Sequence, residues 1–476
     1  MNIDQAIDQA MRPVADAVAG FIFYAVPLLG TEIPLIVVWL IMGGLFFTLY
    51  FRFINLRGFR HAIHLVSGRF HKDHHPGEIS QFQALTTAVS GTVGIGNIAG
   101  VAVAISLGGP GATLWLIIAG LLGMSTKFAE CTLAVRFRHH HAHESVSGGP
   151  MYYLERGLAE RNWPKVGRSL GLFYAAAMVI GCLGIGNMFQ SNQAAAIFIN
   201  VTGGSASYFA DKAWLLGMTM AAAVGVVIIG GIRSIANTTS RLVPGMAMLY
   251  GVSAVVIIGM NYQELPAACA AIWHGAFSPE GMAGGFVGVM IVGFRRAVFS
   301  NEAGLGSAAI AHSTAKTENP VSEGYVALLE PFIDTVVICT LTALVIITTV
   351  YEPTLAGAEV SGIELTTRAF ASTLSWSPIP LSIAAILFAF STTIAWSYYG
   401  LKAFTYLVGH HRLADLGFKL FFLLFVVLGS SVQLGALVDL SDALVFVVAI
   451  PNLIGLYILA PLVREELKAY ESRPRD

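Results

Sequence analysis

Charged residues are scarce in this sequence. They make up 12% of its 476 residues, whereas a soluble globular protein carries roughly 25%. Hydrophobic residues account for 55% of the chain, which excludes a water-soluble globule and predicts an all-α polytopic membrane protein. The net charge of −1 lacks the basic bias that nucleic-acid binding requires.

Cysteine is also scarce. The chain has four cysteines, and none belongs to a Cys-x-x-Cys pair. Three of them lie in apolar segments, which predicts small buried side chains. Residues 1–12 lack the basic start and the apolar run of a cleavable signal peptide, so none is expected there.

Long apolar runs dominate the rest of the chain. A span across a hydrocarbon core about 30 Å thick needs roughly 20 apolar residues, and we expect about eleven transmembrane helices. Residues 14–30 are apolar but short and interrupted by Asp16 and Pro27, so they predict an interfacial or re-entrant helix, with a twelfth span as the alternative. The expected spans are 33–53, 82–107, 111–135, 170–200, 213–231, 242–260, 283–312, 323–350, 380–407, 416–432 and 440–463.

Lysine and arginine are unevenly divided between the expected loops. With the N-terminus outside and the C-terminus inside, twenty of the 27 Lys and Arg residues lie in inside segments. Only Arg12, Lys212 and Arg368 lie outside, and the other four fall within spans. This bias follows the positive-inside rule and favours an odd number of spans. It predicts a multi-pass protein of the cytoplasmic (inner) membrane with its C-terminus in the cytoplasm.

Two halves of five spans each begin with a glycine-rich interruption of a membrane-length helix. The first half covers 82–260, and the second covers 261–463 with its preceding outer loop. Residues 1–81 hold the interfacial helix, one extra span and a cytoplasmic loop, and 464–476 form a cytoplasmic tail. Because five is odd, the second half starts from the opposite side of the membrane. The pattern predicts a 5+5 inverted repeat with two discontinuous helices and a binding site between them.

The first interruption, AVSGTVGIGNIAG, runs from Ala88 to Gly100. Glycine in a helix centre is about 1 kcal/mol less favourable than alanine. Unpaired backbone at membrane depth is tolerated only where it lines a cavity or is buried in protein. Close helix packing is the alternative explanation of these glycines. The segment also matches a dinucleotide-binding fingerprint, but it lacks the strand that this motif needs.

The chemistry of the first interruption suits a zwitterion. We expect the amides of Gly94, Ile95 and Gly96 to bind a carboxylate. The carbonyls of residues 90–93 would coordinate a hard cation such as sodium. Asn97 would accept from an ammonium group or ligate sodium. Glycine along this wall leaves room only for a small side chain, so the predicted ligand is a small neutral amino acid.

Two further segments place polar side chains inside expected spans. Three hydroxyls follow one another at 391–393, one turn from Trp396, and are candidate ion ligands; hydrogen bonding to their own helix is the alternative. Four amides lie within 186–193, and we favour Gln190 as the one that faces the site. Hydrogen bonds between helices are the alternative role for these amides.

Ionisable residues within the spans are functional candidates by default. Lys127 and Glu130 are three residues apart on one helix, so we expect them to pair. Glu302 and Asp334 are the carboxylates to test for proton coupling. Histidine clusters at 71–75 and 139–143 lie in predicted cytoplasmic loops and are interpreted as surface residues.

The chain resembles the alanine or glycine:cation symporter family. The motifs that carry the resemblance are 90–100, 108–111, 148–153, 299–307 and 332–335, and it extends over about residues 30–462. It implies a LeuT-type fold, with ten core helices in a 5+5 inverted repeat and one extra helix. It also implies sodium-coupled uptake of alanine or glycine, in some members with proton substitution.

The same resemblance implies which residues form the site. The substrate would contact Gly94, Ile95, Gly96, Asn97, Gln190, Phe299, Ser300 and Trp396. Sodium would be held by the carbonyls of Ser90 and Val93 and the hydroxyls of Thr392 and Thr393; a slip of the hydroxyl assignment by one residue, to Ser391, is the alternative.

We therefore predict a secondary active transporter, not an enzyme, that imports alanine or glycine with sodium by alternating access. The implied partners are the small substrate, Na+ as the coupling ion and the lipid bilayer, with no cofactor and no nucleic acid. A proton-coupled or exchanging amino-acid carrier on the same fold is one alternative. An ion channel is another, but it needs a continuous polar stripe, whereas the polar residues here cluster at one depth.

Overall fold

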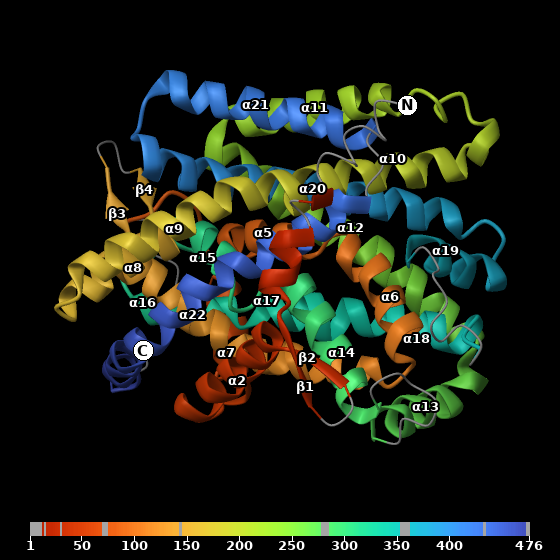
Figure 1. Cartoon of the computed structure of the whole chain (residues 1–476), viewed down its shortest axis with the longest axis horizontal. Helices are drawn as coiled ribbons and strands as arrows, with labels where there is room; N and C mark the ends of the chain where they lie inside the picture. The colour runs from red at the N-terminus through yellow and green to blue at the C-terminus, as the bar shows by residue number, and fades with distance from the viewer. Residues whose placement is uncertain are drawn as a thin grey trace.

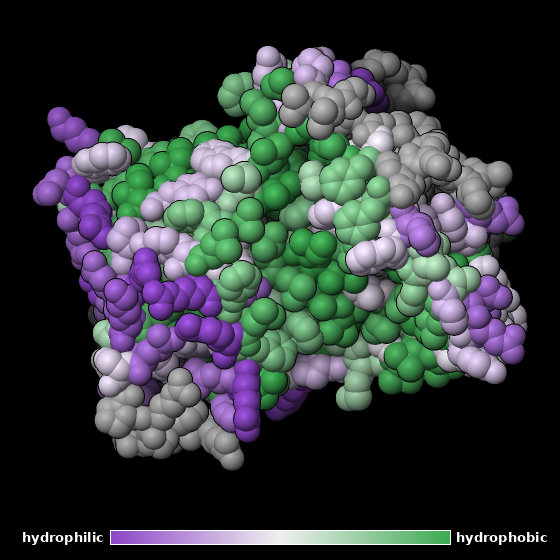
Figure 2. Space-filling model, turned by 90° about the horizontal axis from the view of Figure 1, so that it is seen from below, coloured by the Kyte–Doolittle hydropathy of each residue, from purple (hydrophilic) through white to green (hydrophobic). Residues whose placement is uncertain are grey.

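The computed structural model describes residues 12–13, 16–28, 31–68, 75–141, 145–277, 285–352, 362–431 and 435–472. Helices at all eleven expected ranges make up most of this part of the chain. Figure 2 shows a broad hydrophobic band across the middle of the molecule, with hydrophilic residues gathered toward its two ends. This is the surface expected of a protein whose helices cross a bilayer.

The N-terminal region differs from its sequence-based prediction. Residues 16–22 are helical, but Ala25–Leu28 (β1) pairs antiparallel with Thr31–Pro34 (β2). The expectation of a helix throughout 14–30 was therefore wrong for its second half. Pro27, which has no N–H to donate, lies in this two-stranded hairpin, where both strands are edges. The extra span outside the repeats follows as α2 (Leu35–Tyr50).

The first repeat contains the five expected spans. Two of them differ in extent from the prediction, because α12 begins at residue 231 instead of 242 and the third span begins at residue 164 instead of 170. The third span also contains a π-helical turn. The elements are α5 (Gln81–Thr92), η1 (Ile95–Asn97), α6 (Ala99–Gly108), α7 (Ala112–Arg136), α9 (Pro164–Leu183), η3 (Gly184–Met188), α10 (Phe189–Val201), α11 (Ala213–Ile229) and α12 (Gly231–Met260).

The second repeat has the same order of elements. Its second span also contains a π-helical stretch, and its last helix continues past residue 463. The elements are α14 (Gly285–Asn301), α15 (Ser307–His312), α16 (Pro320–Ala327), α17 (Leu329–Pro331), η6 (Phe332–Cys339), α18 (Thr340–Thr349), α20 (Pro378–Val408), α21 (Arg412–Ser431) and α22 (Gly435–Glu471).

Length and hydropathy identify a subset of these helices as membrane-spanning by themselves. Within the described residues, seven helices are long and apolar enough to cross a bilayer, or eight if the bent pair α5 and α6 counts as one span. Helices α2 and α11 are shorter apolar helices. The all-α polytopic fold is thus confirmed, although the shorter and broken spans need the repeat to be recognised.

The connecting elements gather at the two ends of the molecule. Figure 1 places α8, β3, β4 and the end of α22 at one end and α13 and α19 at the other. The long helices α9 and α20 run between these ends. The connecting elements are α3 (Ile54–Arg57), α4 (Phe59–Val66), β3 (His139–His140), β4 (Val146–Ser147), α8 (Pro150–Glu160), η4 (Gly204–Ala206), η5 (Tyr262–Glu264), α13 (Leu265–Phe277) and α19 (Gly362–Thr373).

Both predicted discontinuous helices are broken. At the first break, the chain leaves α5 with Val93 at ψ 95° and resumes as η1 and α6, so that the two halves are bent by 61°. At the second break, five residues separate α14 from α15, and Glu302, Gly304 and Gly306 all have positive φ. A Cβ at Gly306 would lie 2.3 Å from Pro150 Cγ, so both space and backbone conformation require glycine there.

Candidate functional site

Asn97 joins the first break to the second repeat. Its Oδ1 accepts a hydrogen bond from the Gly94 amide at 2.8 Å. Its Nδ2 lies 3.0 Å from Ser300 Oγ and 2.6 Å from Asp334 Oδ1, and donates to both. The Asn97 carbonyl accepts from the Thr342 hydroxyl at 2.8 Å. The side chain is fully buried, so one amide fixes the conformation of the break and holds it against the second half of the chain.

Asp334 is the carboxylate at the centre of this network. Its Oδ2 accepts from Ser300 Oγ at 2.8 Å and from Thr335 Oγ1 at 2.7 Å, while its Oδ1 accepts from Asn97. The residue is fully buried in the π-helical stretch η6, a kind of distortion that is frequent at functional sites. A buried negative charge requires compensation, which a sodium ion or a substrate ammonium group can provide.

A second meeting point lies between α5 and α20. In a continuous helix the Ser90 carbonyl would accept a hydrogen bond from the Gly94 amide, but that amide donates to the Asn97 side chain instead. Thr392 Oγ1 donates to the Ser90 carbonyl instead, at 3.0 Å, and Ser90 Oγ donates to the Ser391 carbonyl at 2.7 Å. Carbonyl and hydroxyl oxygens are thereby brought together at the break, and these are the ligands that hard cations prefer.

The other two hydroxyls of the 391–393 segment turn back to their own helix. Thr393 Oγ1 donates to the Ala389 carbonyl at 2.9 Å, and Ser391 Oγ donates to the Phe388 carbonyl at 3.0 Å. Of the three side chains, the structure brings only that of Thr392 to α5. Back-bonding, the alternative role for these hydroxyls, thus applies to two of them.

Gln190 lies across from the first break with an unused acceptor. Its Nε2 donates to the Ile185 carbonyl at 3.1 Å, but its buried Oε1 has no hydrogen-bond partner. A Cβ at Gly94 would lie 3.5 Å from this Oε1, and a Cβ at Gly96 would lie 3.5 Å from the Phe299 ring. The two glycines therefore let the backbone of the break approach an amide at Gly94 and an aromatic ring at Gly96, and an ammonium group could use the free amide oxygen.

Trp396 links both breaks to α20. Its Nε1 lies 3.3 Å from the Gly91 carbonyl and 3.2 Å from Glu302 Oε1 and donates to both. A Cβ at Gly186 would lie 2.2 Å from Trp396 Cγ, so the indole packs directly on backbone. Glu302 also accepts from the Ser307 hydroxyl. The buried tryptophan therefore contacts the two breaks more than it faces a ligand space.

The second break is held by the scaffold around it. Glu130 Oε1 accepts from the Gly306 amide at 3.1 Å and from Asn452 Nδ2 at 2.8 Å. The same Asn452 Nδ2 donates to the Gly304 carbonyl at 2.8 Å. A charged oxygen such as that of Glu130 forms a strong hydrogen bond in a low-dielectric interior when it accepts from a backbone amide that the break leaves without a helical partner. This break is therefore a fixed connection.

The expected ion pair between Lys127 and Glu130 does not form. Lys127 Nζ instead lies 2.9 Å from Glu330 Oε1, and both residues are fully buried. His312 Nδ1 lies 2.6 Å from Glu323 Oε1, and its Nε2 is 3.8 Å from Glu330 Oε2. The i,i+3 spacing did not decide the partner, because a neighbouring helix brings a second carboxylate to the same lysine.

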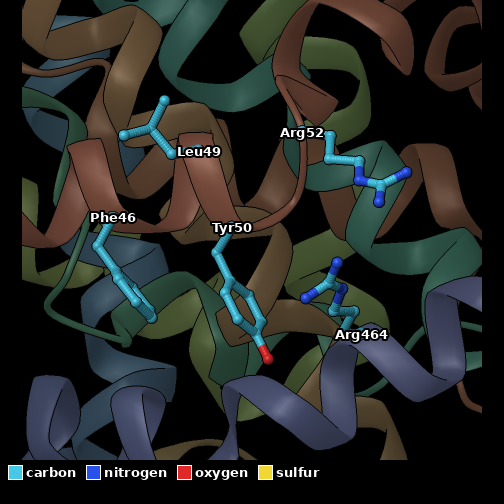
Figure 3. A pocket seen from close by; sticks show the side chains of 5 residues that line it. All are labelled: Phe46, Leu49, Tyr50, Arg52 and Arg464. Carbon is cyan, nitrogen blue, oxygen red and sulfur yellow. The ribbon is translucent and has the colours of Figure 1, made fainter.

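One surface hollow lies apart from this network. Figure 3 shows it between Phe46, Leu49 and Tyr50 on one side and Arg52 and Arg464 on the other. Its volume is about 370 Å³. The Arg464 guanidinium lies 4.9 Å from the centre of the Tyr50 ring. None of the predicted site residues lines it, so it is a feature of the α2 and α22 surface.

The histidines that follow α7 form an edge-to-face cluster with His410. The ring centroids of His139 and His141 are 4.4 Å apart, as are those of His141 and His410. Burial, followed by the neighbouring His410 and His139, lowers the pKa of His141 to about 4. No group of three or more His, Cys, Asp or Glu residues could hold a metal in the part of the chain that the structure describes. Residues 71–74 and 142–144 of the two clusters lie outside that part.

The residue set predicted from sequence omitted Asp334 and Glu302 from the site. Both carry a signal that was visible, because a carboxylate within an apolar span is a candidate site residue. The sequence did not reveal their partners: Asn97 approaches Asp334 from the other repeat, and Trp396 approaches Glu302 from α20 of the same repeat. The assembled site presents carbonyl and hydroxyl oxygens where α5 meets α20, and an unpartnered amide oxygen beside the first break.

Comparison with known proteins points to sodium-coupled symporters. Residues 20–476 match the model of the sodium:alanine symporter family. The sodium/alanine symporter AgcS of Methanococcus maripaludis is 37% identical over 441 residues, covering 92% of this chain and 94% of that protein. The probable sodium/glutamine symporter GlnT of Bacillus subtilis is 33% identical, covering 92% and 87% of the two chains.

Solved structures support the fold. The crystal structure of MhsT in complex with L-phenylalanine aligns with a TM-score of 0.57 at 16% identity. The alignment covers 83% of this chain and 99% of MhsT. At this identity the likeness establishes the architecture of the helices alone.

Proposed function

The chain belongs to the sodium:alanine symporter family, a family of sodium-coupled amino-acid symporters, and we propose that it imports alanine or glycine together with sodium. The observation that carries the proposal is the buried network in which Asn97 ties Gly94 to Ser300 and Asp334. Such a network joins both repeats at one point, so a ligand bound there can influence how the repeats sit against each other.

The substrate would bind beside the first break. The amides of Ile95 and Gly96 begin a short helix and suit a carboxylate, whereas the Gly94 amide is engaged by Asn97. The unpartnered Oε1 of Gln190 suits an ammonium group. Phe299 lies close to where a Cβ of Gly96 would be, so the space favours a substrate with a small side chain such as alanine or glycine.

Sodium would bind where α5 meets α20. The carbonyls of Ser90 and Val93 and the hydroxyl of Thr392 are its proposed ligands, because Thr392 already reaches the Ser90 carbonyl. Thr393 would join only after its side chain rotates away from Ala389. A cation at this position would hold the inner half of the first discontinuous helix against α20.

Transport would follow alternating access between two conformations. Ligands can drive the exchange only if they bind the two states with different affinities, and the first discontinuous helix provides ends that can move relative to α20. We propose that the protein lies in the cytoplasmic membrane with its N-terminus outside and its C-terminus inside, from the charge bias of its loops.

The proposal is tested by uptake of radiolabelled alanine into proteoliposomes that contain the purified protein. One sodium ion moving down about 100 mV provides roughly 2.3 kcal/mol, and a tenfold gradient adds about 1.4 kcal/mol. Together these support accumulation of several hundred-fold, so uptake with an inward sodium gradient is expected to exceed equilibrium clearly. An equal potassium gradient is the control.

A third arm of the uptake experiment distinguishes protons from sodium as the coupling ion. A proton gradient without sodium should leave alanine at equilibrium if sodium alone drives the transporter. Accumulation with protons alone would move the coupling to a carboxylate, with Asp334 and Glu302 the first candidates. Competition by unlabelled glycine, serine and glutamine in the sodium arm would then rank the substrates.

A further inference from the structure

A second small cavity lies at one end of α20, apart from the helix breaks. Its volume is about 150 Å³. The walls come from the chain just before α5, the junction of α11 and α12, α20 and the start of α21. The polar and charged lining residues are Glu78, Ser397, Tyr398, Lys402, Asp415 and Lys419. Tyr398 is six residues beyond Thr392 on α20, which places the cavity about 9 Å along the helix from the proposed ion site.

One polar group in this cavity has no partner. The Tyr398 hydroxyl is buried, with the residue only 3% exposed, and it forms no hydrogen bond. A buried hydroxyl without a partner is unfavourable, and native proteins rarely leave one. A bound molecule in the cavity would supply the missing partner.

The charges around the hydroxyl have both signs. Lys402 Nζ donates to the Val146 carbonyl at 3.1 Å and to Ser147 Oγ at 2.9 Å. An ammonium group has three donors, so this lysine keeps one for another acceptor. Glu78 Oε1 accepts from the Val146 amide at 2.9 Å, which holds the carboxylate at the same hairpin. The ammonium of Lys402 also lies 5.4 Å from the centre of the Tyr398 ring.

The opposite wall repeats this pairing. Lys419 Nζ lies 2.9 Å from Asp415 Oδ2, one turn apart on α21. The Lys419 side chain is only 10% exposed, whereas that of Asp415 is 40% exposed. The cavity thus presents ammonium and carboxylate groups on two walls, with the free phenol between helices.

We propose that this cavity binds a small zwitterion, namely the transported amino acid, on its way out of the protein. Its carboxylate would pair with Lys402 or Lys419 and accept from the Tyr398 hydroxyl, and its ammonium group would pair with Glu78 or Asp415. The volume of about 150 Å³ is well above the roughly 10–15 Å³ that one water molecule needs, which leaves room for a small amino acid. This inference rests on the proposed function, since it takes its ligand from it.

The position of Glu78 gives the site a consequence. Glu78 comes two residues before the Ser80 cap of α5, and Lys402 lies on α20, so a ligand between them would hold the inner end of the first discontinuous helix in place. Amino acid on the inner side of the membrane would therefore favour the conformation of this structure and slow further uptake.

Binding of radiolabelled alanine to protein in nanodiscs without ethanolamine lipids tests the site. Gln190→Ala weakens the central site and leaves the second cavity intact, and Asn97→Ala serves as an independent background. We expect either variant to retain one sodium-independent alanine site. Adding Tyr398→Phe should weaken that site about threefold to tenfold, the effect of one lost hydrogen bond.

Tyr406→Phe is the matched control, because Tyr406 lies on the same helix but its hydroxyl donates to Glu155 outside the cavity. It should leave alanine binding as it is in the background variant. Absence of the sodium-independent site in both backgrounds, or equal effects of the two tyrosine changes, would overturn the proposal. Sodium-driven uptake by the unmodified protein, measured separately, shows whether the proposed function itself holds.

Discussion

The backbone of the first break is satisfied by neutral side chains of the break itself and of α20, whereas that of the second break is satisfied by a carboxylate and an amide of the surrounding helices. At the first, Asn97 and Thr392 take up the Gly94 amide and the Ser90 carbonyl. At the second, Glu130 and Asn452 take up the amide of Gly306 and the carbonyl of Gly304.

The difference extends to the space around each break. Beside the first, Gln190 Oε1 is buried without a partner, and nothing lies within 4 Å of a Cβ at Gly100. At the second, the Leu305 carbonyl accepts a hydrogen bond from the Tyr174 hydroxyl at 2.9 Å, and Gly306 is packed on Pro150. We infer that the first break serves a ligand and the second fixes the position of its helices. Four variants test this contrast.

Gly306→Ala should have the largest effect, and it should act on folding. A left-handed conformation disfavours a non-glycine residue by about 1–2 kcal/mol, and overpacking adds about 1–3 kcal/mol. We expect a strongly lowered thermal midpoint in detergent, measured by fluorescence-detected size exclusion after heating. Gly100→Ala near the first break is the control and should fold normally. Equal midpoints for the two variants would contradict the contrast.

Asn97→Ala should abolish transport but leave a folded protein. It removes the donor to Asp334 and the acceptor of the Gly94 amide, and hydrogen bonds to charged groups contribute about 1.5–3 kcal/mol each. Sodium-driven alanine uptake should fall more than tenfold, while a monodisperse peak on size exclusion reports the fold. Near-normal uptake would mean that the network is not the site.

Thr392→Val should weaken sodium binding and leave the stability of the fold nearly unchanged. Its hydroxyl crosses to the Ser90 carbonyl, so its loss is expected to raise the sodium concentration for half-maximal uptake about tenfold, the equivalent of one ligand contribution near 1.4 kcal/mol. Thr393→Val should have the weaker effect, because that hydroxyl donates to its own helix. The reverse order would show that Thr393 rotates toward the ion, as the family resemblance implied.

Much of the architecture could be predicted from the sequence, because it follows from hydrophobic length and from glycine at two breaks. The hairpin at Ala25–Leu28 could not, since a short apolar run is compatible with a helix or a strand. The start of α12 was placed too late, because Arg233 and Arg241 on its first turns resemble a loop when only charge is considered.

The depth of the site residues within their spans was predictable from the sequence, but their hydrogen-bond and ion-pair partners were not. Residues such as Asn97 and Thr392 stood out as polar groups in apolar spans. Which hydroxyl of three faces inward, and which carboxylate pairs with Lys127, depends on helices hundreds of residues away in the chain. The spacing of residues on one helix does not carry that information, so Thr393 was included and Asp334 was left out.

Gln190→Ala should have the smallest effect on stability and a selective effect on substrate. Because its Oε1 has no partner, truncation removes an unsatisfied group together with the bond to Ile185, and we expect the thermal midpoint to change little. Alanine affinity at saturating sodium should fall about threefold to tenfold, since one hydrogen bond to the ammonium group is lost. Asn192→Ala is a matched control on the same helix, because its amide donates to Gly429 of the scaffold. A loss of stability without a loss of affinity would assign Gln190 to packing, and the first break would then resemble the second.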